Sequence, residues 1–158
     1  MTRPSVAGRL AAAFLVVTTL IVAAPAFAGS VYVSDGFAIE GYDPVAYFTD
    51  SKPVKGSYLY QYRWHDATWL FASAEHRDAF AAAPEKYAPQ YGGFCAYAVS
   101  HNSTASIDPA AWSIVGGKLY LNYNKIVRLL WNQDVPGHIA SGDKNWPGLE
   151  KEKEQAKN

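Results

Sequence analysis

The segment 58–73, YLYQYRWHDATWLFAS, constrains the fold of this chain more than any other part of the sequence. Aromatic side chains occupy every second position from Tyr58 to Trp64, and strand residues two positions apart lie on the same face of a sheet. His65 and Asp66 then interrupt the alternation and supply a turn. The segment therefore predicts a β-hairpin with one aromatic face, and such a face usually packs against a core.

The rest of the chain alternates between helix and hairpin patterns. Polar helix caps and helical apolar spacing mark the helices, and a Gly-Gly turn marks a second hairpin. Residues 94–100 fit a helix and a strand equally well. These patterns predict an α+β fold with two β-hairpins and several short helices around one core. The segments are a helix near 44–48 with Asp43 as its N-cap, a helix in 74–88 that breaks before Pro84, a hairpin at 112–123, a helix at 124–134 and a short terminal helix within 135–148.

Two apolar sets are expected in the core. Trp69, Phe71 and Phe80 should join the first hairpin to the helix that follows it, because strand alternation runs directly into helical spacing. In the helix at 124–134, the spacing predicts that the apolar side chains Ile126, Leu129 and Leu130 face inward, with Lys125 and Arg128 outward.

The first 28 residues have the pattern of a signal peptide. Arg3 and Arg9 precede an apolar run, and Ala26 and Ala28 form a small-x-small cleavage pattern. The run is shorter than the roughly 20 apolar residues that span a membrane. We therefore expect a periplasmic or secreted mature chain from Gly29, without a stable membrane span after cleavage; an uncleaved N-terminal anchor is the alternative.

The mature chain is predicted to form one domain at 29–147, followed by a charged C-terminal tail at 148–158. The whole chain has 14 basic and 14 acidic residues. Removing the two arginines of the leader leaves 12 basic residues against 14 acidic ones. This balance argues against nucleic acid as a partner.

Cys95 is the single cysteine, so the chain cannot form an internal disulfide. It could be a small buried core residue, which is the usual place of a free cysteine. It could instead be a thiolate ligand for a soft metal such as Cu(I). A catalytic dyad with His101 is a third possibility, although on a regular helix or strand the two side chains diverge or stand far apart. No two of the four histidines are four residues apart, the spacing of a helical zinc site.

Three blocks of the sequence together resemble the secreted, single-domain members of the YHS-domain family. They are GYDPVAYF, ATWLFASAEHRDAFAAAPEKYAPQYGGFCAYAVS and WSIVGGKLYLNYN, and the resemblance covers nearly the whole mature chain. It implies a treble-clef-like YHS scaffold and a heavy-metal context such as copper transport. Metal-binding members carry ligand cysteines in the first and second blocks, at positions where this chain has Ala46, Ala72 and His76.

The sequence therefore predicts an exported, non-enzymatic binding or accessory protein that binds a transition metal, copper or zinc, and works with a metal-handling protein. The predicted metal ligands are Cys95, the only thiol, and His76, which stands where the family has a ligand. Thiolate and imidazole suit these ions better than calcium or magnesium. The alternative is a cysteine-dependent enzyme that acts on a small substrate.

Overall fold

The computed structural model describes residues 29–156, so the predicted signal peptide and its cleavage site lie outside or at the edge of the described residues. The described chain forms two β-sheets and six α-helices, which confirms the predicted α+β class. Its elements are β1 (Val33–Ser34), β2 (Phe37–Ala38), η1 (Ile39–Gly41), α1 (Ala46–Thr49), β3 (Ser57–Trp64), β4 (Ala67–Phe71), α2 (Ala74–Ala82), α3 (Pro84–Tyr87), η2 (Gln90–Gly93), α4 (Ala96–Ser100), β5 (Asp108–Val115), β6 (Lys118–Asn122), α5 (Lys125–Trp131) and α6 (Val135–Gln155).

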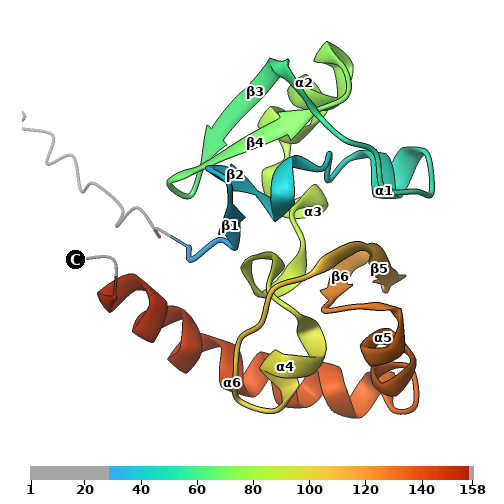
Figure 1. The fold of residues 1–158 in the computed structure, drawn as a ribbon, viewed down its shortest axis with the longest axis vertical. Helices are drawn as coiled ribbons and strands as arrows, with labels where there is room; N and C mark the ends of the chain where they lie inside the picture. The colour runs from blue at the N-terminus through green and yellow to red at the C-terminus, as the bar shows by residue number, and fades with distance from the viewer. Residues whose placement is uncertain (1–28, 157–158) are drawn as a thin grey trace, which may run out of the picture.

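The larger sheet has the strand order β1-β2-β4-β3. Strand β4 pairs antiparallel with β3 and parallel with β2. Figure 1 places this sheet at one end of the long axis, together with α1 and α2. The second sheet, β5-β6, lies toward the other end with α4, α5 and α6. The segment containing α3 and η2 runs between the two ends, so the first half of the sequence builds one end and the second half builds the other.

The first hairpin forms where the sequence predicts it. Its two turn residues, His65 and Asp66, both have positive φ, 49° and 56°. That conformation matches the twist of the flanking strands in a two-residue hairpin. The pairing sets Tyr62 opposite Trp69 and Trp64 opposite Ala67.

One residue of the predicted aromatic face does not lie on it. Tyr60, Tyr62 and Trp64 pack against the core, whereas Tyr58 is 69% exposed. The register of the β3–β4 pair shifts between Ser57 and Gln61. A shift of register breaks the two-residue period of a strand, so the prediction for Tyr58 is wrong.

The predicted core around Phe80 is confirmed. Trp69, Phe71 and Phe80 are each no more than 1% exposed. The ring of Phe80, on α2, lies 5.1 Å from the rings of both Trp69 and Phe71, on β4. This contact fixes the helix against the sheet.

Replacing Phe80 with alanine should lower the free energy of unfolding by about 3–5 kcal/mol, because a fully buried ring is lost and leaves a cavity. Chemical denaturation measures the change. The matched control is Tyr58→Ala, which removes a mostly exposed ring whose one aromatic partner is Phe37, so the loss should stay at about 1 kcal/mol. Similar losses in the two variants would show that the Phe80 ring is not a core group.

The ambiguous segment 94–100 is helical from Ala96 to Ser100. It follows a tight turn in which Gly92 and Gly93 have φ of 61° and 85°. A Cβ atom on Gly92 would lie only 1.9 Å from the carbonyl oxygen of Ser30. Glycine is therefore required at this position by both conformation and space.

The predicted inward face of the helix at 124–134 is wrong. Ile126, Leu129 and Leu130, on α5, are 71%, 65% and 39% exposed. The buried residue is Trp131, which packs into a cluster with Tyr91, Ala96, Val99, Tyr120 and Leu149. Arg128, predicted to face outward, donates from Nε to Ser113 Oγ on β5. The largest ring of the helix decides which face is buried, and this turns the smaller apolar side chains outward.

Helix α6 is longer than the short terminal helix that the sequence suggests. It continues through Pro147 to Gln155 and therefore includes most of the predicted charged tail at 148–158. Leu149 is buried in the cluster around Trp131, and Glu150 Oε1 accepts a hydrogen bond from the backbone of Ser30. These contacts hold the charged end of the helix against the body. Across residues 29–156, no helix combines the length and apolarity needed to cross a membrane.

Candidate functional site

Asp43 is the most heavily bonded buried side chain near the predicted metal position. It is 0% exposed and lies just before α1. Its Oδ1 accepts hydrogen bonds from the backbone of Val45 at 2.8 Å and of Ala46 at 3.3 Å. These bonds satisfy amide groups at the start of the helix, so the capping role predicted for Asp43 is confirmed.

The second carboxyl oxygen of Asp43 reaches a different part of the chain. Oδ2 accepts a hydrogen bond from the backbone of Ala72 at 2.8 Å and lies 2.6 Å from Nδ1 of His76. Ala72 follows β4 and His76 lies on α2. One buried carboxyl group therefore ties the start of α1 to the junction between β4 and α2.

The contact with Asp43 orients the imidazole of His76. Because the carboxyl oxygen accepts, Nδ1 is the donor, and the neutral ring then carries its lone pair on Nε2. Nε2 lies 3.3 Å from Oγ1 of Thr49, and the His76 side chain is 19% exposed. A carboxylate on one ring nitrogen with the other nitrogen free is the arrangement that supports histidine ligands in metal sites.

Asp43, His76 and Thr49 also have the connectivity of a hydrolase triad: a carboxyl group, an imidazole and a hydroxyl. The hydroxyl of Thr49, however, lies 2.8 Å from Oδ1 of Asp50 and 3.3 Å from the carbonyl oxygen of Val45. Its single hydrogen is therefore directed to stronger acceptors than the imidazole. This geometry favours a binding role for His76 over a role as general base.

Cys95 lies in the core and is 1% exposed. Its sulfur accepts a hydrogen bond from the backbone of Tyr123 at 3.2 Å and lies 3.8 Å from Oδ1 of Asn122. Burial raises the pKa of the Cys95 thiol above its usual value, against the opposing effect of nearby backbone hydrogen bonds. A reactive cysteine needs a lowered pKa and access to solvent, so the surroundings of Cys95 favour packing over nucleophilic chemistry.

The hydrogen bonds of the two predicted metal ligands go to different groups. Cys95 bonds to Tyr123 and Asn122, on and after β6, and His76 to Asp43 and Thr49, near α1. Among the described residues, no hydrogen bond joins Cys95 to His76, its proposed partner in a metal site, or to His101, its alternative partner in a dyad. No group of three or more histidine, cysteine or acidic residues suited to a metal ion is found among residues 29–156. A shared metal ion between Cys95 and His76 stays a prediction.

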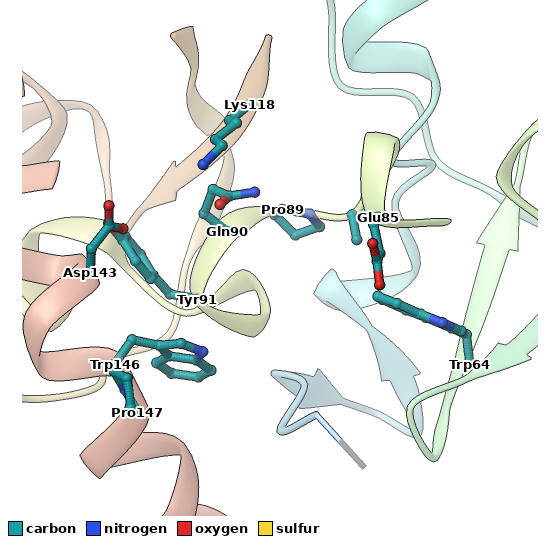
Figure 2. A pocket seen from close by; sticks show the side chains of 10 residues that line it. Trp64, Glu85, Pro89, Gln90, Tyr91, Lys118, Asp143, Trp146 and Pro147 are labelled. Carbon is teal, nitrogen blue, oxygen red and sulfur yellow. The ribbon is translucent and has the colours of Figure 1, made fainter. Parts of the chain in front are cut away.

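The structure also contains an open cleft of about 390 Å³ to which no sequence motif points. Figure 2 shows Trp64 and Glu85 on one side of it and Tyr91, Asp143 and Trp146 on the other. The hydroxyl of Tyr91 donates to Oδ1 of Asp143 at 2.9 Å, which joins η2 to α6 at the wall of the cleft. The lining residues are Trp64, Glu85, Ala88, Pro89, Gln90, Tyr91, Lys118, Asp143, Trp146 and Pro147.

This lining combines flat aromatic faces with charged groups of both signs. Such a surface can stack a ring and bond its polar substituents, which is how small polar ligands are usually held. The residues come from β3, α3, η2, β6 and α6. No local motif joins segments so far apart in the sequence, and only their spatial convergence reveals the cleft.

Comparison of the chain with protein-family models, with curated proteins and with solved structures finds no match in any of the three. The resemblance to the YHS-domain family therefore rests on the three sequence blocks alone.

The hydrogen bonds of Asp43 predict that substituting Asp43 lowers the stability of the fold more than substituting His76. In Asp43→Asn, the amide nitrogen cannot accept from Ala72, and an unsatisfied buried donor costs about 1–3 kcal/mol. In His76→Ala, Asp43 keeps its three backbone donors, so the loss should be smaller. Urea denaturation of both variants measures the difference. A larger loss in His76→Ala would contradict the view that Asp43 chiefly stabilises the fold.

The thiol of Cys95 should react with a disulfide reagent at neutral pH roughly tenfold or more slowly in the folded protein than in the unfolded chain, because it is buried and its pKa is raised. In Cys95→Ala the backbone N–H of Tyr123 loses its acceptor, which should cost about 1–3 kcal/mol of stability. Rapid labelling of the folded protein, together with unchanged stability of the variant, would argue for a reactive rather than a packed thiol.

Proposed function

We propose that this chain is a small exported binding protein on a YHS-like scaffold, and that its ligand is a transition-metal ion held at His76. The observation that carries the proposal is the 2.6 Å contact between Oδ2 of Asp43 and Nδ1 of His76. It fixes the orientation of the ring and leaves the lone pair on Nε2 for a ligand, which reduces the entropy lost on binding.

The ligand chemistry around His76 favours copper or zinc. Imidazole suits these borderline ions. Oγ1 of Thr49 lies 3.3 Å from Nε2, and Oδ1 of Asp50 accepts a hydrogen bond from that hydroxyl at 2.8 Å. The YHS resemblance adds to this, since His76 stands at a position where the family has a ligand. Two cysteine positions of the family are filled by Ala46 and Ala72.

A site with so few protein ligands is open. Structural zinc sites normally take four protein ligands, whereas an open site keeps positions for water or for a ligand from another molecule. An exchangeable ion suits an accessory protein that passes metal to, or receives it from, a metal-handling partner. The leader-like residues 1–28 support a periplasmic or secreted location for this exchange.

Competition titrations with Cu(I) and Zn²⁺ test the proposal on the wild type, His76→Ala, Cys95→Ser and His65→Ala. His76→Ala should lower the metal affinity of one site at least tenfold. Removing a metal ligand, or a group that supports one, typically lowers metal affinity by roughly 10–100-fold. His65, which stacks on Trp64 at 3.7 Å, is the matched histidine control and should have no effect.

The two remaining outcomes separate the possible ligand sets. A loss of affinity in both His76→Ala and Cys95→Ser would indicate that the two residues share one ion, as the sequence analysis predicts. If His76→Ala binds as tightly as the wild type at every site, the proposed site at His76 is wrong.

A further inference from the structure

A smaller cavity adjoins the cleft that lies between Trp64 and Trp146. Its volume is about 130 Å³, and it shares Trp64, Ala88 and Pro89 with the cleft. The two spaces therefore meet along these residues and make one groove. His76 lines neither space, so the groove is separate from the site proposed for a metal ion.

Two tryptophans stand on opposite walls of the cleft, and packing fixes both rings (Figure 2). Trp64 stacks on His65, with 3.7 Å between the ring centres and 26° between the ring planes. Trp146, on α6, lies 6.1 and 6.0 Å from the rings of Tyr91 and Phe94. Both tryptophans are half-buried and line the cleft, so part of each ring is open to a ligand. Rings held in this way lose little entropy when a ligand stacks on them.

The charged and polar side chains of the groove favour a neutral ligand. Among residues 29–156, the side chains of Glu85, Gln90 and Lys118 make no hydrogen bond or ion pair, so they are free to bond a ligand. The groove is lined by three carboxyl groups, on Glu85, Asp143 and Glu150, and by the ammonium group of Lys118. The carboxyl groups oppose an anion and the ammonium group opposes a cation. A ligand with hydroxyl groups matches this lining, because each hydroxyl both donates and accepts.

The smaller cavity is lined by a residue whose buried hydroxyl has no partner. Ser30 is 1% exposed, and its Oγ makes no hydrogen bond within the described part of the chain. Such an atom is costly, and in native proteins it usually marks a place for a water or a ligand. The backbone of Ser30 is held in place. Its N–H donates to Oε1 of Glu150 at 3.3 Å, and its carbonyl oxygen lies so close to Gly92 that a Cβ atom there would be 1.9 Å away.

We propose that the groove binds a neutral carbohydrate chain, with a pyranose ring stacked on a tryptophan face in the cleft and a hydroxyl group of the next sugar bonded to Ser30. The hydrogens on the face of a sugar ring are weakly positive, so they pack favourably against the negative face of an indole. Glu85, Gln90 and Lys118 supply acceptors and donors for the remaining hydroxyl groups.

The size and shape of the groove agree with this ligand. The cleft volume of about 390 Å³ lies within the range of roughly 300–1,000 Å³ that is usual for ligand sites. The cleft is open and continues past Trp64 into the smaller cavity. An open groove with a second compartment suits a chain of sugars better than a single enclosed molecule.

Isothermal calorimetry tests the proposal on the protein produced from the full sequence. The probes are three neutral tetramers, of β-1,4-linked glucose, α-1,4-linked glucose and β-1,4-linked N-acetylglucosamine. At least one of them should bind with a Kd of about 1 mM or below. Tetragalacturonic acid, which carries a carboxylate on every ring, should bind more weakly than that tetramer.

Variants of the lining residues locate the binding site. Glu85→Ala removes a hydrogen-bond partner and Trp146→Ala removes a stacking face, and each should weaken binding by roughly two- to tenfold or more. Trp146→Phe keeps a ring and should retain most of the affinity, which guards against misfolding of the alanine variant. The matched control is Glu152→Ala, which removes an exposed carboxyl group of α6 that lines neither space and should bind like the wild type.

Ser30→Ala separates a role in ligand binding from a role in the fold. Because the hydroxyl has no partner in the free protein, its loss should leave the free energy of unfolding unchanged or raise it. Affinity for the tetramer should fall by roughly two- to tenfold, as for one lost hydrogen bond. Failure of all three neutral tetramers to bind, tighter binding of the acidic tetramer, or an equal loss in Glu152→Ala would overturn the proposal. Lower stability of Ser30→Ala with unchanged affinity would also contradict it.

Discussion

The buried carboxyl group of Asp43 holds together the end of the molecule that carries the first hairpin. It accepts from three backbone amides and contacts one imidazole, and these partners belong to α1, the end of β4 and α2. A buried carboxyl group is costly unless it is fully hydrogen-bonded. The need to satisfy both oxygens of Asp43 therefore fixes the three segments relative to one another. The orientation of His76 is a consequence of that requirement, and the proposed ligand nitrogen inherits its position from the fold.

The other end of the molecule depends on aromatic packing instead. Trp131 is fully buried and contacts the ring of Tyr120 at a centre distance of 5.3 Å. Tyr91 joins the same cluster and bonds through its hydroxyl to α6. Helix α6 crosses this cluster, lines the cleft and carries His138, whose ring centre lies 5.6 Å from that of His101. The long C-terminal helix therefore fixes the positions of Tyr91 and of the aromatic cluster, which earlier parts of the chain supply.

The sequence predicted those features in which neighbouring residues decide the outcome. The hairpin turn at His65 and Asp66, the cap at Asp43 and the core contact of Phe80 all follow from local patterns. The prediction failed at Tyr58, where a register shift broke the strand period, and at the apolar face of α5. In α5 the spacing was helical as expected, but the burial of Trp131 selected a different face.

By itself, the sequence determined the α+β class and the first hairpin, because both rest on residue type and short-range spacing. His76 became a candidate ligand only through the resemblance of its sequence block to the YHS-domain family. Only the tertiary structure decided that Asp43 orients His76, that Cys95 is enclosed by Asn122 and Tyr123, and that a cleft opens between distant segments. It alone brought His101 beside His138. The physical reason is that periodicity specifies which face of an element is apolar, whereas contacts between elements depend on how several such faces pack at once.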